Sequence, residues 1–145
     1  HFSIIRTGMV YGTNKVKPTL PEWILEKITK NKPLEMISDQ FMTPTYLDNL
    51  CNMIEEILLK NYTGIIHLAG TTKISRYDFA KKILTILKKP TDKLFPISSS
   101  QFDSNVCRPK DSSLNTSKAI SLLTTKPEDF NSSIEKYFKN YSEYT

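Results

Sequence analysis

The chain alternates short apolar segments with amphipathic helical patterns, and this alternation is the feature that most constrains its fold. Short buried strands are predicted at 2–5, 34–37, 65–68 and 94–97. Helices, with apolar residues three or four positions apart, are predicted at about 19–31, 47–60, 75–89, 116–123 and 129–141. Apolar strands that alternate with helices are typical of an α/β chain with a covered, largely parallel sheet.

Glycine is scarce, and its positions limit the fold further. The four glycines are Gly8, Gly12, Gly64 and Gly70, and none belongs to a Gly-x-Gly-x-x-Gly pattern. A doubly wound dinucleotide-binding sheet needs that glycine-rich first turn, and it needs more strands than are visible here. The 145 residues therefore suggest half of such a fold or a smaller α/β module. Because the chain begins with His1 rather than Met, we expect a piece of a longer protein.

The charge pattern argues against nucleic acid as a partner. The chain has 20 Lys and Arg against 15 Asp and Glu, a net charge of +5, but its only arginines are Arg6, Arg76 and Arg108. Nucleic-acid readers usually cluster arginines with interleaved aromatic residues, whereas these lysines are scattered. No apolar run approaches the roughly 18 residues of a membrane span, and no signal peptide is evident. We expect no membrane partner and a cytoplasmic location.

The cysteines and histidines do not suggest a metal site. Cys51 and Cys107 form no Cys-x-x-Cys motif, and Cys51 is predicted to be a buried, reduced thiol on a helix. His67 lies in an apolar strand without a partner at metal-ligand spacing, which favours a hydrogen-bonded core histidine. No metal ligands are predicted.

Four blocks of sequence resemble blocks of a known family, and they occur in the same order and at the same spacing as in that family. They are Ile-Ile-Arg-Thr-Gly-Met-Val-Tyr-Gly at 4–12, Asp-Gln-Phe-Met-Thr-Pro-Thr at 39–45, Gly-Ile-Ile-His-Leu-Ala-Gly at 64–70 with Ser-Arg-Tyr-Asp-Phe-Ala at 75–80, and Arg-Pro-Lys-Asp-Ser-Ser-Leu-Asn-Thr-Ser-Lys at 108–118. Together they resemble the C-terminal half of dTDP-4-dehydrorhamnose reductases, which belong to the extended short-chain dehydrogenase/reductase superfamily.

This resemblance implies a fold and an activity. The fold would be the C-terminal part of a Rossmann-type NAD(P)-binding fold plus a small α/β substrate-binding domain, with the N-terminal Rossmann half absent and residues 1–145 forming the substrate-binding half. The family uses NADPH, bound mainly by that absent half, to reduce the 4-keto group of a nucleotide-linked deoxysugar in dTDP-L-rhamnose biosynthesis. The expected partners are a nucleotide-diphosphate sugar and the chain's own N-terminal half. A Mg²⁺ requirement and a homodimer stay open.

The catalytic Tyr-x-x-x-Lys of the family is expected upstream of residue 1, so we predict no catalytic residue here and no activity for this chain alone. The segment from Tyr11 to Lys15 has the same spacing. It follows a predicted strand, however, and Gly12 and Asn14 are poor helix formers. We interpret Tyr11 as structural.

Arg108 is the strongest candidate for substrate binding. A guanidinium bridges phosphate oxygens with two parallel hydrogen bonds, which an ammonium group cannot do. Arg108 lies in a polar stretch before a helix, and an equivalent Arg-Pro segment contacts the diphosphate in related nucleotide-sugar enzymes. A surface arginine is the alternative. Arg6 is interpreted as a structural ion pair and Arg76 as a helix-surface residue in a position where the family usually has Trp.

The resemblance also suggests other site residues. Substrate binding is predicted for Met9, Val10, Gln40, Phe41, Thr43 and Pro44, and cofactor binding for Thr7 and Gly8. Met9 replaces a tryptophan that lines the family's sugar pocket and offers no aromatic platform. This difference leaves the exact sugar open and favours one of two alternatives, a non-catalytic regulatory subunit similar to that of methionine adenosyltransferase. The other alternative is an epimerase or dehydratase of the same superfamily. The Asp-Gln-x-x-x-Pro-Thr block favours the reductase.

Overall fold

The computed structural model describes residues 2–13, 16–101 and 108–141, and the chain divides into two compact units. Unit 1 consists of His1–Gly12, Thr43–Lys73 and Ser113–Thr145, and unit 2 of Thr13–Met42 and Ile74–Ser112. Each unit combines helices with strand pairs, and three of the four pairs among the described residues are parallel, so the predicted α/β class is confirmed.

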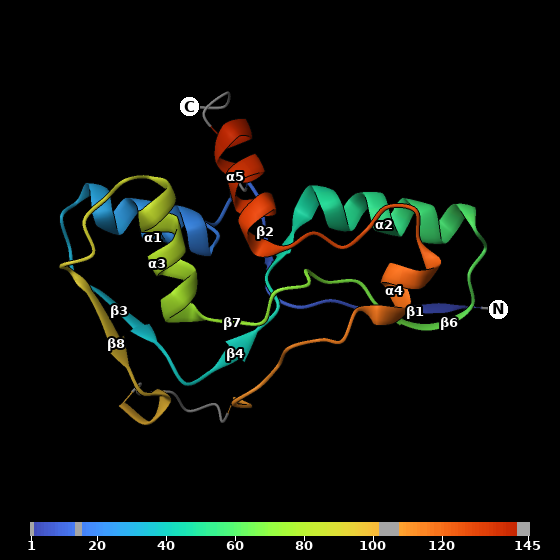
Figure 1. Cartoon of the computed structure of the whole chain (residues 1–145), viewed down its shortest axis with the longest axis horizontal. Coiled ribbons are helices and arrows are strands. Elements are labelled where there is room, and N and C mark those ends of the chain that lie inside the picture. The colour runs from blue at the N-terminus through green and yellow to red at the C-terminus, as the bar shows by residue number, and fades with distance from the viewer. Residues whose placement is uncertain (1, 14–15, 102–107, 142–145) are drawn as a thin grey trace. The chain divides into compact units, whose positions relative to one another are not determined.

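Unit 1 contains β1 (Ser3–Arg6), β2 (Val10–Tyr11), β5 (Thr45–Tyr46), α2 (Leu47–Leu59), β6 (Gly64–His67), α4 (Ser117–Leu122) and α5 (Phe130–Tyr141). β1 pairs in parallel with β6, and α2 directly precedes β6 in the chain (Figure 1). One face of this strand pair is packed against α2 and α4 through a buried core of Leu50, Met53, Ile57, Ile66, Leu68, Ala119 and Leu123. This packing explains why the sequence of β6 is a run of apolar residues.

The opposite face of the β1–β6 pair is uncovered within the residues that the structure describes. Ile4 is 42% exposed and Ile65 is 45% exposed, while Ile5 on the other face packs on the core. The prediction of a buried first strand is therefore wrong for this chain. The apolar pattern is the one expected for a strand covered on both faces, but only one face has a helix layer here.

A second part of unit 1 is built around buried aromatic side chains. β2 pairs in parallel with β5, and α5 packs against β5. Tyr11, Tyr46, Phe130 and Tyr137 form what we call the aromatic cluster, in which the ring of Tyr11 lies 5.8 Å from Tyr46, 6.2 Å from Phe130 and 5.8 Å from Tyr137. The apolar face of the helix predicted at about 129–141 is thus part of the core.

Unit 2 contains α1 (Leu20–Thr29), β3 (Leu34–Ile37), β4 (Phe41–Met42), β7 (Ile74–Ser75), α3 (Arg76–Ile86), β8 (Leu94–Ile97) and the short 3-10 helix η1 (Ser99–Gln101). β3 and β8 pair in parallel, α3 contacts both strands, and α1 contacts α3 and β3 (Figure 1). Its buried residues include Ile24, Leu34, Met36, Phe79, Ile83, Leu84 and Leu94. These are the apolar positions of the predicted helical and strand patterns.

Local capping signals fix where two helices of unit 2 begin. The Ser75 hydroxyl accepts a hydrogen bond from the Asp78 backbone N–H at 3.0 Å and donates to the Asp78 carboxylate at 2.6 Å. The Thr19 backbone N–H donates to the Glu22 carboxylate at 2.6 Å. Such reciprocal bonds satisfy donors that a helix N-terminus leaves unpaired. The start of α3 therefore lies where the sequence predicts it.

Helical periodicity overestimated the buried face of α2. Cys51 is exposed, contrary to its predicted burial, and Leu58 on the same helix is 68% exposed. The buried positions are Asn49, Leu50, Met53 and Ile57. They form a narrower stripe than the apolar residues do, because a single strand pair lies beneath the helix. None of the helices in the described part of the chain is long and apolar enough to cross a membrane.

Candidate anion-binding site

Three segments that are distant in sequence lie side by side in unit 2. β4 pairs in an antiparallel way with β7, in the register of Phe41 with Ser75. On the same residue, the Phe41 backbone N–H donates to the carbonyl oxygen of Lys110 at 2.8 Å, and the Ser112 N–H donates to the carbonyl oxygen of Phe41 at 2.9 Å. These bonds bring the start of α3, the 40–42 segment and the 108–112 segment to one place.

A pocket of about 420 Å³ lies where these segments meet. The residues that line it, here called the arginine pocket, are Gln40, Phe41, Met42, Arg76, Arg108, Pro109 and Ser112. They include two guanidinium groups and no acidic side chain. The pocket is therefore suited to a negatively charged ligand.

Arg76 lies in an environment that disfavours its own charge. It is the first residue of α3 and is half-buried, whereas Arg108 is exposed. Burial, with the nearby positive charge of Arg108, lowers the pKa of Arg76 from its ordinary value. Neither guanidinium has an ion pair or a hydrogen bond with another residue in the described parts of the chain. A bound anion would supply the missing counter-charge.

Three of the predicted substrate residues meet in this pocket: Arg108, Gln40 and Phe41. Arg76 joins them, so its interpretation as a helix-surface residue is wrong. Met42 also lines the pocket and was not singled out from the sequence. The capping motif at Ser75 fixed Arg76 in the first helical turn, but only the pairing of β7 with β4 places that turn beside the loop.

The other predicted site residues belong to unit 1 and do not line the arginine pocket. Thr43 and Pro44 are buried, and the Thr43 hydroxyl accepts a hydrogen bond from the Leu114 N–H at 3.2 Å. This bonding gives Thr43 a structural function whether or not it contacts substrate. The functional assignments of Thr43 and Pro44 stay predictions.

The segment after β1 contains Thr7, Gly8, Met9 and Val10. Thr45 holds it in place: the Thr45 hydroxyl donates to the Gly8 carbonyl oxygen at 2.8 Å, and the Thr45 N–H donates to the Met9 carbonyl oxygen at 3.0 Å. Met9 has a φ of 25°, which is uncommon for a residue other than glycine. Cofactor or substrate binding by this segment stays a prediction.

Tyr11 has the environment of a structural residue. It is fully buried, and its hydroxyl donates to the Ser133 hydroxyl at 2.8 Å. Burial raises the pKa of Tyr11 well above its usual value, whereas a tyrosine that acts as a general acid or base needs a pKa near the working pH. This supports the structural interpretation. Lys15, the other member of the apparent motif, lies outside the described residues.

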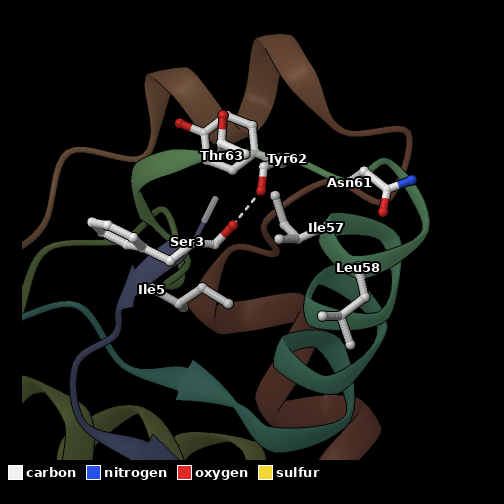
Figure 2. A pocket seen from close by; sticks show the side chains of 8 residues that line it. Ser3, Ile5, Ile57, Leu58, Asn61, Tyr62 and Thr63 are labelled. Carbon is white, nitrogen blue, oxygen red and sulfur yellow. Dashed lines mark hydrogen bonds between the residues drawn. The ribbon is translucent and has the colours of Figure 1, made fainter.

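A larger groove of about 690 Å³ lies in unit 1 at the start of β1 and the end of α2 (Figure 2). It is lined by Phe2, Ser3, Ile5, Ile57, Leu58, Asn61, Tyr62 and Thr63. The Ser3 hydroxyl donates to the Tyr62 carbonyl oxygen across it, as the dashed line in Figure 2 shows. No charged side chain lines this groove, so it offers nothing to balance a phosphate.

Two further predictions concern isolated polar residues. The Nδ1 of His67 lies 3.1 Å from the Asn115 carbonyl oxygen, in agreement with the predicted hydrogen bond, but the residue is half-buried and does not belong to the core. Arg6 is exposed and has no ion pair with any other described residue, so the predicted structural ion pair is wrong. Among residues 2–13, 16–101 and 108–141, no group of three or more His, Cys, Asp or Glu could hold a metal ion.

Comparison with known proteins identifies the family of this α/β chain. The family model described as "RmlD substrate binding domain" matches residues 1–143. The chain belongs to the RmlD substrate-binding domain family. Among its relatives, the Haloferax volcanii protein named "Probable low-salt glycan biosynthesis reductase Agl14" is 26% identical over 96% of the chain and 48% of its own length. The Bacillus subtilis spore coat polysaccharide biosynthesis protein SpsK is 26% identical over 97% of the chain and 48% of its own length.

A solved structure supports the same assignment to the RmlD family. The dTDP-4-dehydrorhamnose reductase from Yersinia enterocolitica superposes with a TM-score of 0.86 at 28% identity and covers 96% of this chain and 49% of its own. The chain therefore spans about half the length of the relatives it matches.

Proposed function

We propose that this chain is the substrate-binding part of an NADPH-dependent reductase that acts on the 4-keto group of a nucleotide-linked deoxysugar, with dTDP-4-dehydro-L-rhamnose as the substrate. In this proposal Arg108 binds the diphosphate, and Gln40 and Phe41 line the same pocket. The observation that carries it is the convergence of these three residues in a cationic pocket of an RmlD-family chain. The named relatives, two of which are described as reductases, support the reaction class.

The experiment that tests substrate binding is calorimetry with dTDP on the chain and on two variants. Arg108→Gln removes the charge and keeps a polar side chain, and we expect it to weaken dTDP binding about tenfold or more, because a charge-assisted bidentate contact is lost. Arg6→Gln is the matched control, because it removes the same charge from an exposed position of unit 1. Equal affinities for dTDP in all three proteins would remove Arg108 from the site.

A second part of the proposal is that the cofactor loop and the catalytic tyrosine come from another part of the whole protein. The described residues contain no glycine-rich dinucleotide loop, and Tyr11 is buried. The bare apolar face of the β1–β6 pair supports a further structural layer there, since parallel sheets are covered on both faces. We also propose that the whole protein is cytoplasmic.

This second part is tested by comparing the chain with the whole protein. We expect the whole protein to oxidise one NADPH per 4-keto nucleotide sugar and the chain alone to oxidise none. An epimerase would convert the sugar without net consumption of NADPH. If the chain alone oxidises NADPH with a 4-keto nucleotide sugar, the proposal that the cofactor loop and the catalytic tyrosine come from another part of the protein is wrong.

A further inference from the structure

A second guanidinium lies beside Arg108 in the arginine pocket. We propose that Arg76 is an additional anion-binding residue, and that Arg76 and Arg108 together hold the diphosphate group of the ligand. The identity of that ligand as a nucleotide sugar rests on the proposed function above. The two-arginine anion site itself does not, because it follows from the geometry and charge of unit 2.

The backbone places Arg76 at the pocket by two independent constraints. The hydrogen bonds between Ser75 and Asp78 fix the first turn of α3, so that Arg76 is its first helical residue. The pairing of β7 with β4 then sets that residue beside Phe41, whose backbone also binds the 110–112 segment that follows Arg108. Arg76 is therefore held at the pocket by the same strand that holds the 108–112 segment.

Without a bound anion, the charges in the arginine pocket repel one another. A half-buried guanidinium loses hydration, and a second positive charge nearby repels it. Both effects act on Arg76 and lower its pKa. No acid among the described lining residues offsets them. An anion that carries at least two negative charges would neutralise both arginines, whereas a monoanion would leave one uncompensated.

The shape and lining favour a diphosphate attached to a larger group. A guanidinium presents planar paired donors that match two phosphate oxygens. A volume of about 420 Å³ exceeds what a lone phosphate fills, and lies within the roughly 300–1,000 Å³ of small-molecule sites. Phe41, Met42 and Pro109 supply an apolar wall, and Gln40 adds an uncharged polar group. A nucleoside diphosphate has both the charge and the less polar body that such a lining suits.

The chain has three arginines, so each guanidinium can be observed separately. We suggest titrating the isotope-labelled chain with pyrophosphate and following the three arginine Nε–H signals by NMR. The signals of Arg76 and Arg108 should shift with one common dissociation constant, and that of Arg6 should stay in place. This measurement on the native chain needs no variant to fold.

Matched variants then measure the contribution of Arg76. Arg76→Gln should weaken pyrophosphate binding about tenfold or more, as expected for the loss of a charge-assisted contact. Arg76→Lys should recover part of the affinity, because it keeps the charge and loses the paired donors. Arg6→Gln should bind within about twofold of the native chain, since Arg6 is an exposed residue of unit 1 and does not line the pocket.

The outcomes separate this inference from the proposed function. If Arg108 shifts alone and Arg76→Gln binds pyrophosphate as the native chain does, the role of Arg76 is overturned and the proposed function survives. If neither arginine responds, the two-arginine site is overturned. If both respond to pyrophosphate but dTDP binds no more tightly than pyrophosphate, or less tightly than NADP⁺, the site stands and the substrate of the proposed function is wrong.

Discussion

The aromatic cluster of unit 1 and the arginine pocket of unit 2 are built in opposite ways. In the aromatic cluster, Tyr11, Phe130 and Tyr137 are at most 1% exposed. The ring of Tyr11 meets the rings of Phe130 and Tyr137 edge to face, at distances where aromatic pairs attract one another. In the arginine pocket, Phe41 is 36% exposed, and Arg76 carries a charge without a counter-ion in the described structure.

This difference separates the residues that stabilise the fold from those that bind a ligand. Burial of large apolar side chains is the main favourable contribution to folding. A half-buried charge without a partner contributes little or works against folding. The aromatic cluster should therefore determine the stability of the chain, and the arginine pocket should determine its affinity for anions.

The largest effect is expected from a matched pair of phenylalanine substitutions. Phe130→Ala should lower the free energy of unfolding by about 4 kcal/mol, because it removes a fully buried ring and leaves a cavity. Phe41→Ala should lower it by less than about 1 kcal/mol, because the ring is already partly in water. Urea denaturation followed by tyrosine and tryptophan fluorescence measures both values. Equal losses of unfolding free energy in the two variants would contradict the proposed difference between the aromatic cluster and the arginine pocket.

A smaller effect is expected from adding one methyl group at a close backbone approach in unit 1. A Cβ on Gly70 would overlap the carbonyl oxygen of Pro44, and it would lie 3.3 Å from that of Glu128. Gly70→Ala should therefore destabilise the chain by about 2 kcal/mol through overpacking. Gly8→Ala is the control, because its Cβ would make only ordinary contacts of 3.6 Å with Thr43. Thermal denaturation should separate the two variants, and a native melting temperature for Gly70→Ala would contradict the packing.

The sequence predicted the features that depend on neighbours along the chain. The start of the helix predicted at about 75 and the strand at 34–37 depend on local sequence, and the structure contains both. The burial of Cys51 was predicted wrongly because helical periodicity tells which residues share a face, not how wide the covering layer is. Two-residue strands such as β4 and β7 leave too little pattern to be seen.

The candidate site was only partly predictable for the same reason. Arg108 could be selected from its residue type and its Arg-Pro context. The pocket, however, depends on contacts of Phe41 with Ser75 and with the 110–112 segment, across separations that no sequence pattern encodes. The sequence therefore predicted Arg76 to be a helix-surface residue, although it predicted the start of that helix correctly.

The carboxylate of Glu56 differs from the guanidinium of Arg76 in that its charge is balanced by hydrogen-bond donors of the chain. Glu56 on α2 accepts hydrogen bonds from the backbone N–H groups of Thr124 at 2.7 Å and Thr125 at 2.8 Å. These bonds lower the pKa of Glu56 to about 2 from an ordinary value of 4.5. A carboxylate with a lowered pKa stabilises the fold above its unfolded pKa, and this contribution is lost as the pH falls from about 4.5 toward 2.

Glu56→Gln should therefore reduce the loss of stability on acidification, because the side chain can no longer take up a proton in the unfolded state. The free energy of unfolding, measured by urea titration at several values of pH in this window, should change less steeply than in the native chain. Glu55→Gln, at the exposed neighbouring position, is the matched control and should keep the native slope. Identical slopes for both variants would mean that Glu56 is not linked to folding.

The smallest change in stability, and the sharpest test of the comparison, is expected for Arg76→Met. Methionine keeps an apolar side chain of similar length and removes the half-buried charge, so the free energy of unfolding should be unchanged or higher by up to about 1 kcal/mol. A ligand that binds only the folded state raises its stability, so excess pyrophosphate should stabilise the native chain and have little effect on the variant. With pyrophosphate present, the native chain should thus have the higher of the two melting temperatures. Arg6→Met should follow the native chain under both conditions. If Arg76→Met is clearly less stable without ligand, Arg76 contributes to the fold as the aromatic cluster does, and the separation of stabilising from binding residues fails.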